Sequence, residues 1–240
     1  MRESRAGVSG ESAIGNGHVI VIPSEANADS VMTTICWDVD TQVDFMMATG
    51  KLSVGGAEAL IPNLEAITDW AHHTGVRIVA TADDHDIGHT EITDNPDWKD
   101  TFPPHCMRGT PGQQKLAVTA LHNPLLVQPV PLDPLLVAAS VRAHRGDILL
   151  NKPGTDVFRW NPNASTVLAA LAPDRIIVYG VATDVCTRAA VDGLARLRPT
   201  AKLVIVTDAI RGINDDISRT LVNAWRAAGH TLIRTAELIA

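Results

Sequence analysis

The sequence lacks features that would place the protein in several well-known classes. It has no apolar run that approaches the ~20 residues of a transmembrane helix. A formal net charge of -7 without any basic block argues against nucleic acid or an anionic membrane as the main partner. The glycine patterns of dinucleotide-binding and phosphate-binding loops are also absent, as is any internal repeat. We therefore expect neither a nucleic-acid nor a membrane partner, and the sequence offers no support for nucleotide binding.

Cysteine is scarce. The three cysteines, Cys36, Cys106 and Cys186, are an odd number with no paired spacing. A disulfide framework is therefore not indicated, and a reduced, cytoplasmic setting fits best. The first residues have no apolar core of the kind found in signal peptides, which favours the same location.

The chain is expected to form a single domain behind an N-terminal extension. The extension is placed at 1–32 and the domain at 33–240. Residues 1–17 are polar and rich in glycine and serine, which indicates a flexible tail, and a short edge strand is predicted over 18–22. The 45% hydrophobic content is ample for a sizeable core in the domain.

Strand-like apolar runs alternate with helical segments along the domain. Strands are predicted over 33–39, 76–82, 147–151, 175–179, 202–207 and 231–234, and helices over 57–73, 134–144, 164–171, 186–197 and 214–228. A helical turn and a piece of strand are expected within 116–130. This alternation implies right-handed crossovers, and hence a three-layer α/β fold with a mainly parallel central sheet flanked by helices. The stretch 87–114 has no clear period, and irregular segments of this length are usually functional.

Polar side chains follow the ends of four predicted strands. Asp40, Asp83, Lys152 and Cys186 all lie at or just after such an end. Because parallel strands point the same way, their carboxyl ends share one rim, where open α/β sheets bind their ligands. We therefore expect these four side chains to converge.

Cys186 is the candidate nucleophile. It is expected in the first turn of a helix, where the macrodipole and free N–H groups favour a thiolate. Asp40 could take the thiol proton and Lys152 could stabilise the thiolate, although Asp38 and Asp44 are equally good carboxylates on first principles. Taken alone, Cys186 would more often be a buried structural cysteine and Lys152 a solvated loop lysine. Their placement at one rim favours catalysis.

A second group of residues has the composition of a metal site. It consists of Asp83 and His85, just before the irregular stretch, and His89 and His105 within it. One carboxylate and three imidazoles suit a divalent transition metal such as zinc, iron or manganese. A lone histidine is more often a surface or satisfied residue, but the clustering of these four favours metal binding.

These motifs resemble those of the isochorismatase-like cysteine hydrolases. DTQVDF, which begins at Asp40, is similar to that family's D-x-Q-x-D-F motif, whose first aspartate is catalytic. Lys152 in NKPGTDVF and Cys186 in GVATDVC resemble the family's lysine and nucleophile segments. The resemblance covers about 33–208, implies the family's fold, and favours Asp40 over the neighbouring carboxylates. It also implies a cis bond between Val181 and Ala182, so that the amides of Ala182 and Cys186 form the oxyanion hole.

Within that family the long loop is similar to the metal-binding segment of nicotinamidases. The similar stretches are DDH, the later His89, FPPHC and GTPG. The resemblance implies that the metal ligands are Asp83, His85, His89 and His105. It also implies that Phe45 and Phe102 flank the substrate ring.

The implied function is a metal-dependent amidohydrolase that cleaves nicotinamide to nicotinate and ammonia through a cysteine thioester, within pyridine nucleotide salvage. It would use one divalent metal ion (zinc, iron or manganese) and take a small-molecule amide, and a homo-oligomer is left open. One alternative is a related cysteine amidase acting on another small carboxamide or carbamoyl substrate. The other is a metal- or ligand-binding α/β domain in which the triad is vestigial.

Overall fold

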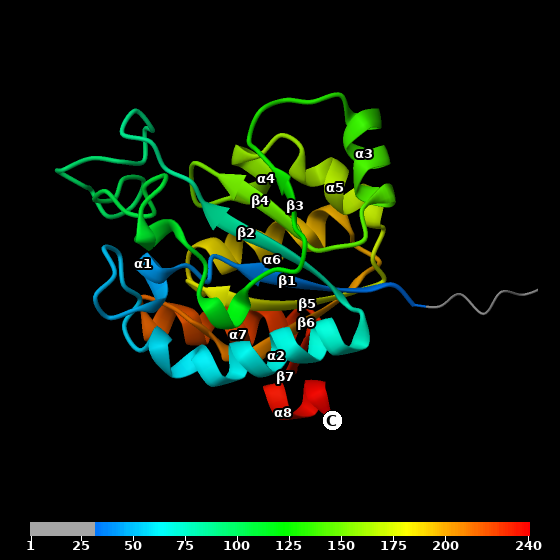
Figure 1. The fold of residues 1–240 in the computed structure, drawn as a ribbon. Coiled ribbons are helices and arrows are strands. Elements are labelled where there is room, and N and C mark those ends of the chain that lie inside the picture. Colours follow the sequence, from blue (N-terminus) through cyan, green and yellow to red (C-terminus); the bar gives the residue numbers. More distant parts are fainter. Residues whose placement is uncertain (1–31) are drawn as a thin grey trace, which may run out of the picture. The chain divides into compact units, whose positions relative to one another are not determined.

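The computed structural model of the chain describes residues 32–240 (Figure 1). The predicted N-terminal extension, with its tail and its strand over 18–22, lies outside the described residues. Among residues 32–240, no helix combines the length and the apolar character needed to cross a membrane.

A seven-stranded parallel sheet lies at the centre of the described domain. Its strands are β1 (Thr34–Val39), β2 (Arg77–Asp83), β3 (Leu125–Val127), β4 (Ile148–Lys152), β5 (Arg175–Val181), β6 (Lys202–Arg211) and β7 (Thr231–Ile233). Their order across the sheet is β3-β4-β2-β1-β5-β6-β7. The predicted α/β class with a parallel central sheet is thereby confirmed.

Helices cover both faces of this sheet (Figure 1). They are α1 (Val43–Met46), α2 (Ile61–Thr74), α3 (Pro134–Ala143), α4 (Val157–Trp160), α5 (Ala164–Leu171), α6 (Cys186–Leu197), α7 (Asp215–Ala227) and α8 (Thr235–Ile239), with short 3-10 turns η1 (Ala57–Leu60), η2 (Pro111–Gln113) and η3 (Ala117–Thr119). Apolar residues of α2 and α8 join one core cluster, whereas those of α3, α5, α6 and α7 join the other.

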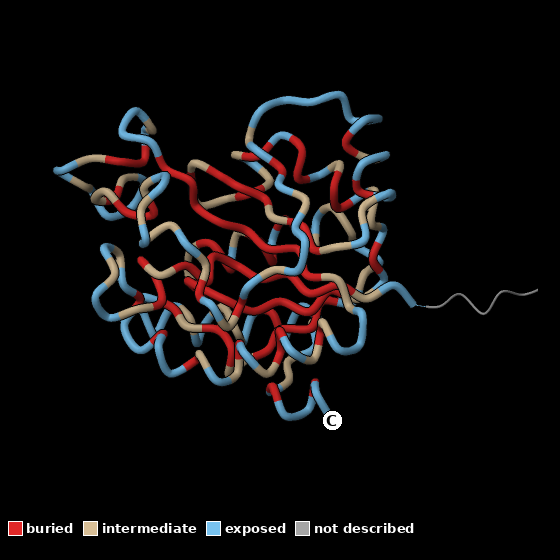
Figure 2. The backbone as a smooth tube through the Cα atoms, in the orientation of Figure 1, coloured by how far each residue is buried: buried red, intermediate tan, exposed pale blue. Residues whose placement is uncertain are grey.

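Side chains of the central strands alternate between these two cores. In β1, Ile35 and Trp37 join the cluster beneath α6, and Cys36 between them joins the cluster beneath α2. All three are buried. Figure 2 shows that the strands at the centre of the sheet are largely buried. Burial on both faces explains why these strands are almost continuously apolar in sequence.

Several elements differ from the sequence prediction. Strand β6 continues to Arg211 instead of ending at 207, because its pairing with β5 shifts register beyond Val178 and then resumes at Gly180. The predicted helix over 57–73 begins as the 3-10 turn η1, and α2 starts only at Ile61, next to Pro62. Helices α1, α4 and α8 were not predicted, because elements of four or five residues show no readable period.

Between β4 and β5 the chain passes from one half of the sheet to the other. The strands β1 to β4 build one half, and β5 to β7 add to the free edge of β1. The carboxyl ends of β1 and β5 therefore flank a topological switch point, where sheets of this kind bind ligands. Beside it, the segment after β2 contains neither α-helix nor extended strand; it is organised by isolated bridges such as Ile92 with Phe102.

Candidate active site

Four adjacent strands bring together the three predicted catalytic residues and the predicted metal ligand Asp83. Lys152 is the last residue of β4 and Asp83 the last residue of β2, while Asp40 directly follows β1 and Cys186 opens α6 just after β5. Because β4, β2, β1 and β5 are consecutive in the sheet, their carboxyl ends lie side by side. The predicted convergence of these four side chains is present in the structure.

The Lys152 ammonium lies between two carboxylates and the thiol. Its Nζ is 2.9 Å from Oδ2 of Asp40, pairs with Oδ1 of Asp83, and is 3.9 Å from Sγ of Cys186. The side chain is only 1% exposed. Burial opposes its charge, but the carboxylates of Asp40 and Asp83 outweigh burial and raise the pKa of Lys152 well above its usual range. Lys152 is therefore a buried cation held by two anions, not a solvated lysine.

Cys186 is buried at the amino end of α6. Burial raises the pKa of its thiol well above the usual value, and the Lys152 ammonium acts in the opposite direction. A helix start was expected to favour the thiolate, yet here the loss of water is the larger effect. The resting group is therefore a thiol, and a reaction at this sulfur needs a base.

Asp40 has the position and the environment of such a base. It has no exposed surface, and Oδ1 accepts a hydrogen bond of 2.6 Å from the Thr81 hydroxyl. Burial raises the pKa of Asp40, although the neighbouring Lys152 lowers it. A carboxylate with a raised pKa is a better proton acceptor. The alternatives Asp38 and Asp44 have other partners: Lys115 lies 2.8 Å from Asp38, and Asp44 accepts the Cys106 amide at 2.7 Å.

The turn between β5 and α6 contains the expected cis peptide bond, between Val181 and Ala182. The Ala182 carbonyl accepts hydrogen bonds from the N–H groups of Val185 and Thr187, each 3.0 Å long. These bonds fold the chain directly into α6. Ala182 and Cys186, at the two ends of this turn, both line the same pocket.

Beyond the ion pairs lies a compact cluster of side chains of the types that can bind a metal ion. It consists of Asp83, His85, Glu91 and His105, all buried, with one ligand atom of each within 4.8 Å of the others. Oδ2 of Asp83 is 3.4 Å from Nε2 of His85 and 3.5 Å from Nε2 of His105, whereas Oε1 of Glu91 is 3.8 Å and 3.9 Å from the same two atoms. These separations exceed ordinary hydrogen-bond lengths.

The chemistry of this cluster fits a divalent cation. Neither ring nitrogen of His85, nor Nε2 of His105, has a hydrogen-bond partner among the described residues, although all are buried. Burial and the nearby Asp83 carboxylate raise the pKa of Glu91 to about 7. Buried polar atoms without partners are costly, and a cation at their centre would satisfy them together.

The cluster differs from the predicted ligand set at one position. It contains Glu91, which was not predicted, and His89 is not part of it. Nδ1 of His89 accepts a hydrogen bond of 3.0 Å from the Asp86 amide, and its ring packs edge-on against that of His85, with 5.8 Å between the ring centroids. The Phe102 amide donates to the Glu91 carbonyl at 2.7 Å, next to the bridge between Ile92 and Phe102. This long-range pairing directs Glu91 inward, and the sequence contains no local signal for it.

Two further polar residues, which the sequence analysis did not single out, hold the β2 end in place. The Gln42 side chain accepts the Asp83 amide at 2.7 Å and donates to the Asp83 carbonyl at 2.8 Å. The Asp84 carboxylate accepts hydrogen bonds from Arg108 at 2.9 Å and from Asn151 at 3.2 Å. These contacts connect the metal cluster to the segment after β2 and to β4.

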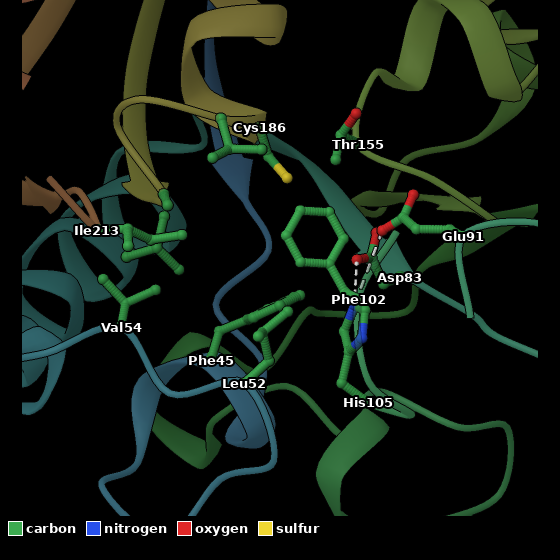
Figure 3. Close-up of a pocket in the computed structure, with 13 residues that line it drawn as sticks. Phe45, Leu52, Val54, Asp83, Glu91, Phe102, His105, Thr155, Cys186 and Ile213 are labelled. Carbon is green, nitrogen blue, oxygen red and sulfur yellow. Dashed lines mark ion pairs between the residues drawn. The ribbon is translucent and has the colours of Figure 1, made fainter. Parts of the chain in front are cut away.

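A small pocket separates the thiol from the metal cluster (Figure 3). Cys186 lies at one side of it, and Asp83, Glu91 and His105 lie at the other. Its remaining walls are mostly apolar and include Phe45, Leu52, Val54, Phe102, Val185 and Ile213. The two phenylalanines expected beside a substrate ring thus both line the pocket, and the other wall residues were not foreseen.

The fold is the three-layer α/β fold of isochorismatase-like proteins. No family model matches the chain. The isochorismatase family protein from Desulfovibrio vulgaris is 21% identical and superposes with a TM-score of 0.65, over 86% of this chain and 96% of its own. Pyrazinamidase of Pyrococcus horikoshii, solved in complex with zinc, is 20% identical with a TM-score of 0.64, over 84% of this chain and 99% of its own.

A curated relative narrows the class. The chain is 28% identical over 201 residues to nicotinamidase/pyrazinamidase of Mycobacterium tuberculosis, which spans 81% of this chain and 95% of that protein. The chain is therefore similar to nicotinamidases and has the fold of isochorismatase family proteins. These comparisons support the predicted resemblance and confirm the predicted enzyme class, a hydrolase acting on amide bonds.

Proposed function

We propose that the chain hydrolyses nicotinamide to nicotinate and ammonia through a thioester on Cys186. The observation that carries this proposal is the pocket in Figure 3, which is apolar along its walls, with a thiol at one side and a metal-binding cluster at the other. A pyridine ring between Phe45 and Phe102 would place a carboxamide beside the sulfur and a ring nitrogen beside the cluster. Zinc in one related structure and the curated relatives support the same conclusion.

The first half of the reaction transfers the acyl group to sulfur. Asp40 takes the proton of the Cys186 thiol, and the Lys152 ammonium, 3.9 Å from Sγ, stabilises the thiolate as it forms. The sulfur attacks the amide carbon, and the amides of Ala182 and Cys186 stabilise the developing oxyanion. Asp40 then donates its proton to the departing nitrogen, which leaves as ammonia as the thioester forms.

The second half releases the acid. A water molecule enters the place vacated by ammonia, and Asp40 takes one of its protons as the oxygen attacks the thioester carbon. The carbon–sulfur bond breaks, nicotinate leaves, and the proton returns from Asp40 to the Cys186 sulfur. Lys152 keeps its proton throughout, because its two carboxylate neighbours raise its pKa well above the usual range.

The metal ligands in this proposal are Asp83, His85, Glu91 and His105. A zinc, iron or manganese ion held there would supply a Lewis-acidic position for the ring nitrogen and thereby orient the carboxamide toward Cys186. The chain's own contribution is to hold these donors rigidly: Gln42 fixes the Asp83 backbone on both sides. The cytoplasmic location, the role in salvage and a homo-oligomer stay predictions.

The pocket walls bear on the alternative substrates. Small carbamoyl and maleamate-like amides carry a carboxylate, which normally requires a basic partner in the binding site. Of the described residues that line this pocket, only His105 is basic, and it belongs to the metal cluster. An uncharged aromatic carboxamide is therefore the better fit.

Ammonia release from nicotinamide, measured with and without a chelator, tests the proposal. We expect turnover that is lost after chelation and restored by adding back a divalent metal. Hydrolysis of other small amides in preference to nicotinamide, without any effect of the chelator, would favour the alternative amidase. A non-enzymatic domain would show no turnover at all, and its Cys186 would react with iodoacetamide no faster than a model thiol.

A further inference from the structure

One side of the pocket is closed by apolar residues from two separate loops. Leu52 and Val54 come from the loop before η1, and Ile213 comes from the loop between β6 and α7. In Figure 3, Ile213 and Val54 lie on the side opposite Glu91 and His105. Ile213 is 59% exposed, yet it lines the pocket. An apolar side chain that faces both solvent and the pocket stands at the mouth of the pocket.

The loop that carries Ile213 is fixed by a residue of the nucleophile turn. Oδ1 of Asp184 accepts the Ile213 amide at 2.9 Å, and Oδ2 accepts the Asn214 amide at 2.8 Å. Asp184 lies two residues before Cys186 in GVATDVC. The Thr183 amide also donates to the Arg211 carbonyl at 2.9 Å. The position of Ile213 is therefore set from the same turn that carries the reactive sulfur.

The other half of the wall is tied to the same loop. Nε of Arg211 donates to the Gly55 carbonyl at 2.9 Å, which connects the end of β6 to the loop bearing Val54. The chain also passes closely at Gly212, where a Cβ atom would collide with the Ser218 hydroxyl and lie 2.8 Å from Oδ1 of Asp184. The wall is thus held by hydrogen bonds and tight backbone packing.

We propose that Ile213 determines which ring substituents the enzyme accepts, and that Asp184 is the positioning residue that holds Ile213 in this place. The inference rests on the proposed function and names the substrate class more narrowly. With the carboxamide at Cys186 and the ring nitrogen at the metal cluster, the C4–C5 edge of the pyridine ring faces Ile213. The preferred substrates are then pyridine carboxamides without a substituent on that edge.

The experiment compares nicotinamide with 5-methylnicotinamide in the metal-loaded enzyme and its variants. One methylene in an apolar pocket changes kcat/KM by roughly 10- to 200-fold. Ile213→Ala is therefore expected to raise the kcat/KM for 5-methylnicotinamide, divided by that for nicotinamide, by about tenfold or more. Asp184→Asn, which keeps one acceptor oxygen, is expected to shift the ratio in the same direction. Ile217→Ala is the matched control, since Ile217 is an exposed isoleucine on α7 that does not line the pocket.

An unchanged ratio in Ile213→Ala would overturn the role of Ile213. If Asp184→Asn lowered kcat/KM equally for both substrates, so that the ratio stayed the same, Asp184 would be a structural residue. The positioning role would then be refuted. A shift in Ile217→Ala as large as in Ile213→Ala would also refute the inference, because it would show that any loss of bulk near α7 has this effect.

A second measurement does not depend on the substrate. Two alkylation rates of Cys186 are compared, one with the bulky N-phenylmaleimide and one with iodoacetamide. Their ratio reports the width of the pocket mouth. Peptide mass mapping distinguishes alkylation of Cys186 from alkylation of Cys36 or Cys106. We expect this ratio to rise about tenfold in Ile213→Ala. If nicotinamide is not hydrolysed, the proposed function fails, while the alkylation ratio still decides whether Ile213 closes the pocket.

Discussion

Replacing Lys152 with methionine would remove the buried ammonium between Asp40 and Asp83 and keep a side chain of similar length. Nζ lies 2.9 Å from the Asp40 carboxylate and pairs with that of Asp83. Removing one partner of a buried ion pair leaves an uncompensated charge and costs about 3–5 kcal/mol. Lys152 also opposes the rise in the pKa of Cys186 and of Asp40. Without it, both groups hold their protons more tightly, so Asp40 is less available as a base and the Cys186 thiolate forms less readily.

The expected result is a fall in kcat/KM for nicotinamide of roughly 10²- to 10⁴-fold, the usual range for loss of acid–base assistance. Ammonia release gives the rate, thermal unfolding gives the stability, and iodoacetamide alkylation of Cys186 gives the reactivity of the thiol. All three are expected to fall in Lys152→Met. The separate measurement of thiol reactivity distinguishes a chemical role from simple unfolding.

Lys115→Met is the matched control. Lys115 also pairs with a buried carboxylate, that of Asp38 at 2.8 Å, but no contact joins it to Cys186 in the described structure. We expect it to lose stability while its thiol reacts within about threefold of the unchanged protein. The reasoning would be refuted if Lys152→Met retained rapid alkylation and turnover, or if Lys115→Met lost them to the same degree.

Four further substitutions test the metal cluster, the nucleophile and the packing of the fold. Loss of a residue that contacts only a metal ligand lowers metal affinity roughly 10- to 100-fold, and Glu91→Gln is expected to lower it by at least as much. His89→Ala should lower metal affinity only slightly. The metal content of the two variants after dialysis decides between the two ligand sets. Cys186→Ala should abolish ammonia release and retain the metal, and appreciable residual hydrolysis would contradict the thioester mechanism. Asp147→Asn, far from the pocket, should lower the free energy of unfolding by about 1–3 kcal/mol, because the buried Asp147 carboxylate pairs with two backbone amides and the His72 ring. Chemical unfolding measures this loss. Activity per folded molecule should not change, and a loss of activity would contradict a purely structural role for Asp147.

The convergence of Asp40, Lys152 and Cys186 could be predicted because its signals are local. Asp40, Lys152 and Cys186 each follow an apolar strand, and a parallel sheet necessarily brings the carboxyl ends of its strands to one edge. The α/β class followed from the same alternation of apolar strands and helical faces. Elements that were missed, such as the four-residue helices α1 and α4, are too short to show a period.

The ligand set could be predicted only in part. Asp83 and His85 lie at the end of a predicted strand, and His105 lies in a recognisable motif, so their inward position had a sequence basis. The choice between His89 and Glu91 had none, because both lie on an irregular segment. It depends on the pairing of Ile92 with Phe102, which turns one side chain inward and leaves the other beside the Asp86 amide.

The sequence by itself determined the parallel α/β framework and the residues at its strand ends, because these follow from hydrophobic periodicity and short motifs. Only the tertiary structure decided that burial keeps the Cys186 thiol protonated, that Lys152 joins Asp40 to Asp83, and that Ile213 closes the pocket. These properties arise from contacts between segments far apart in the chain and from the exclusion of water. A local sequence pattern cannot predict these long-range contacts or the exclusion of water, because both arise only after the strands have assembled.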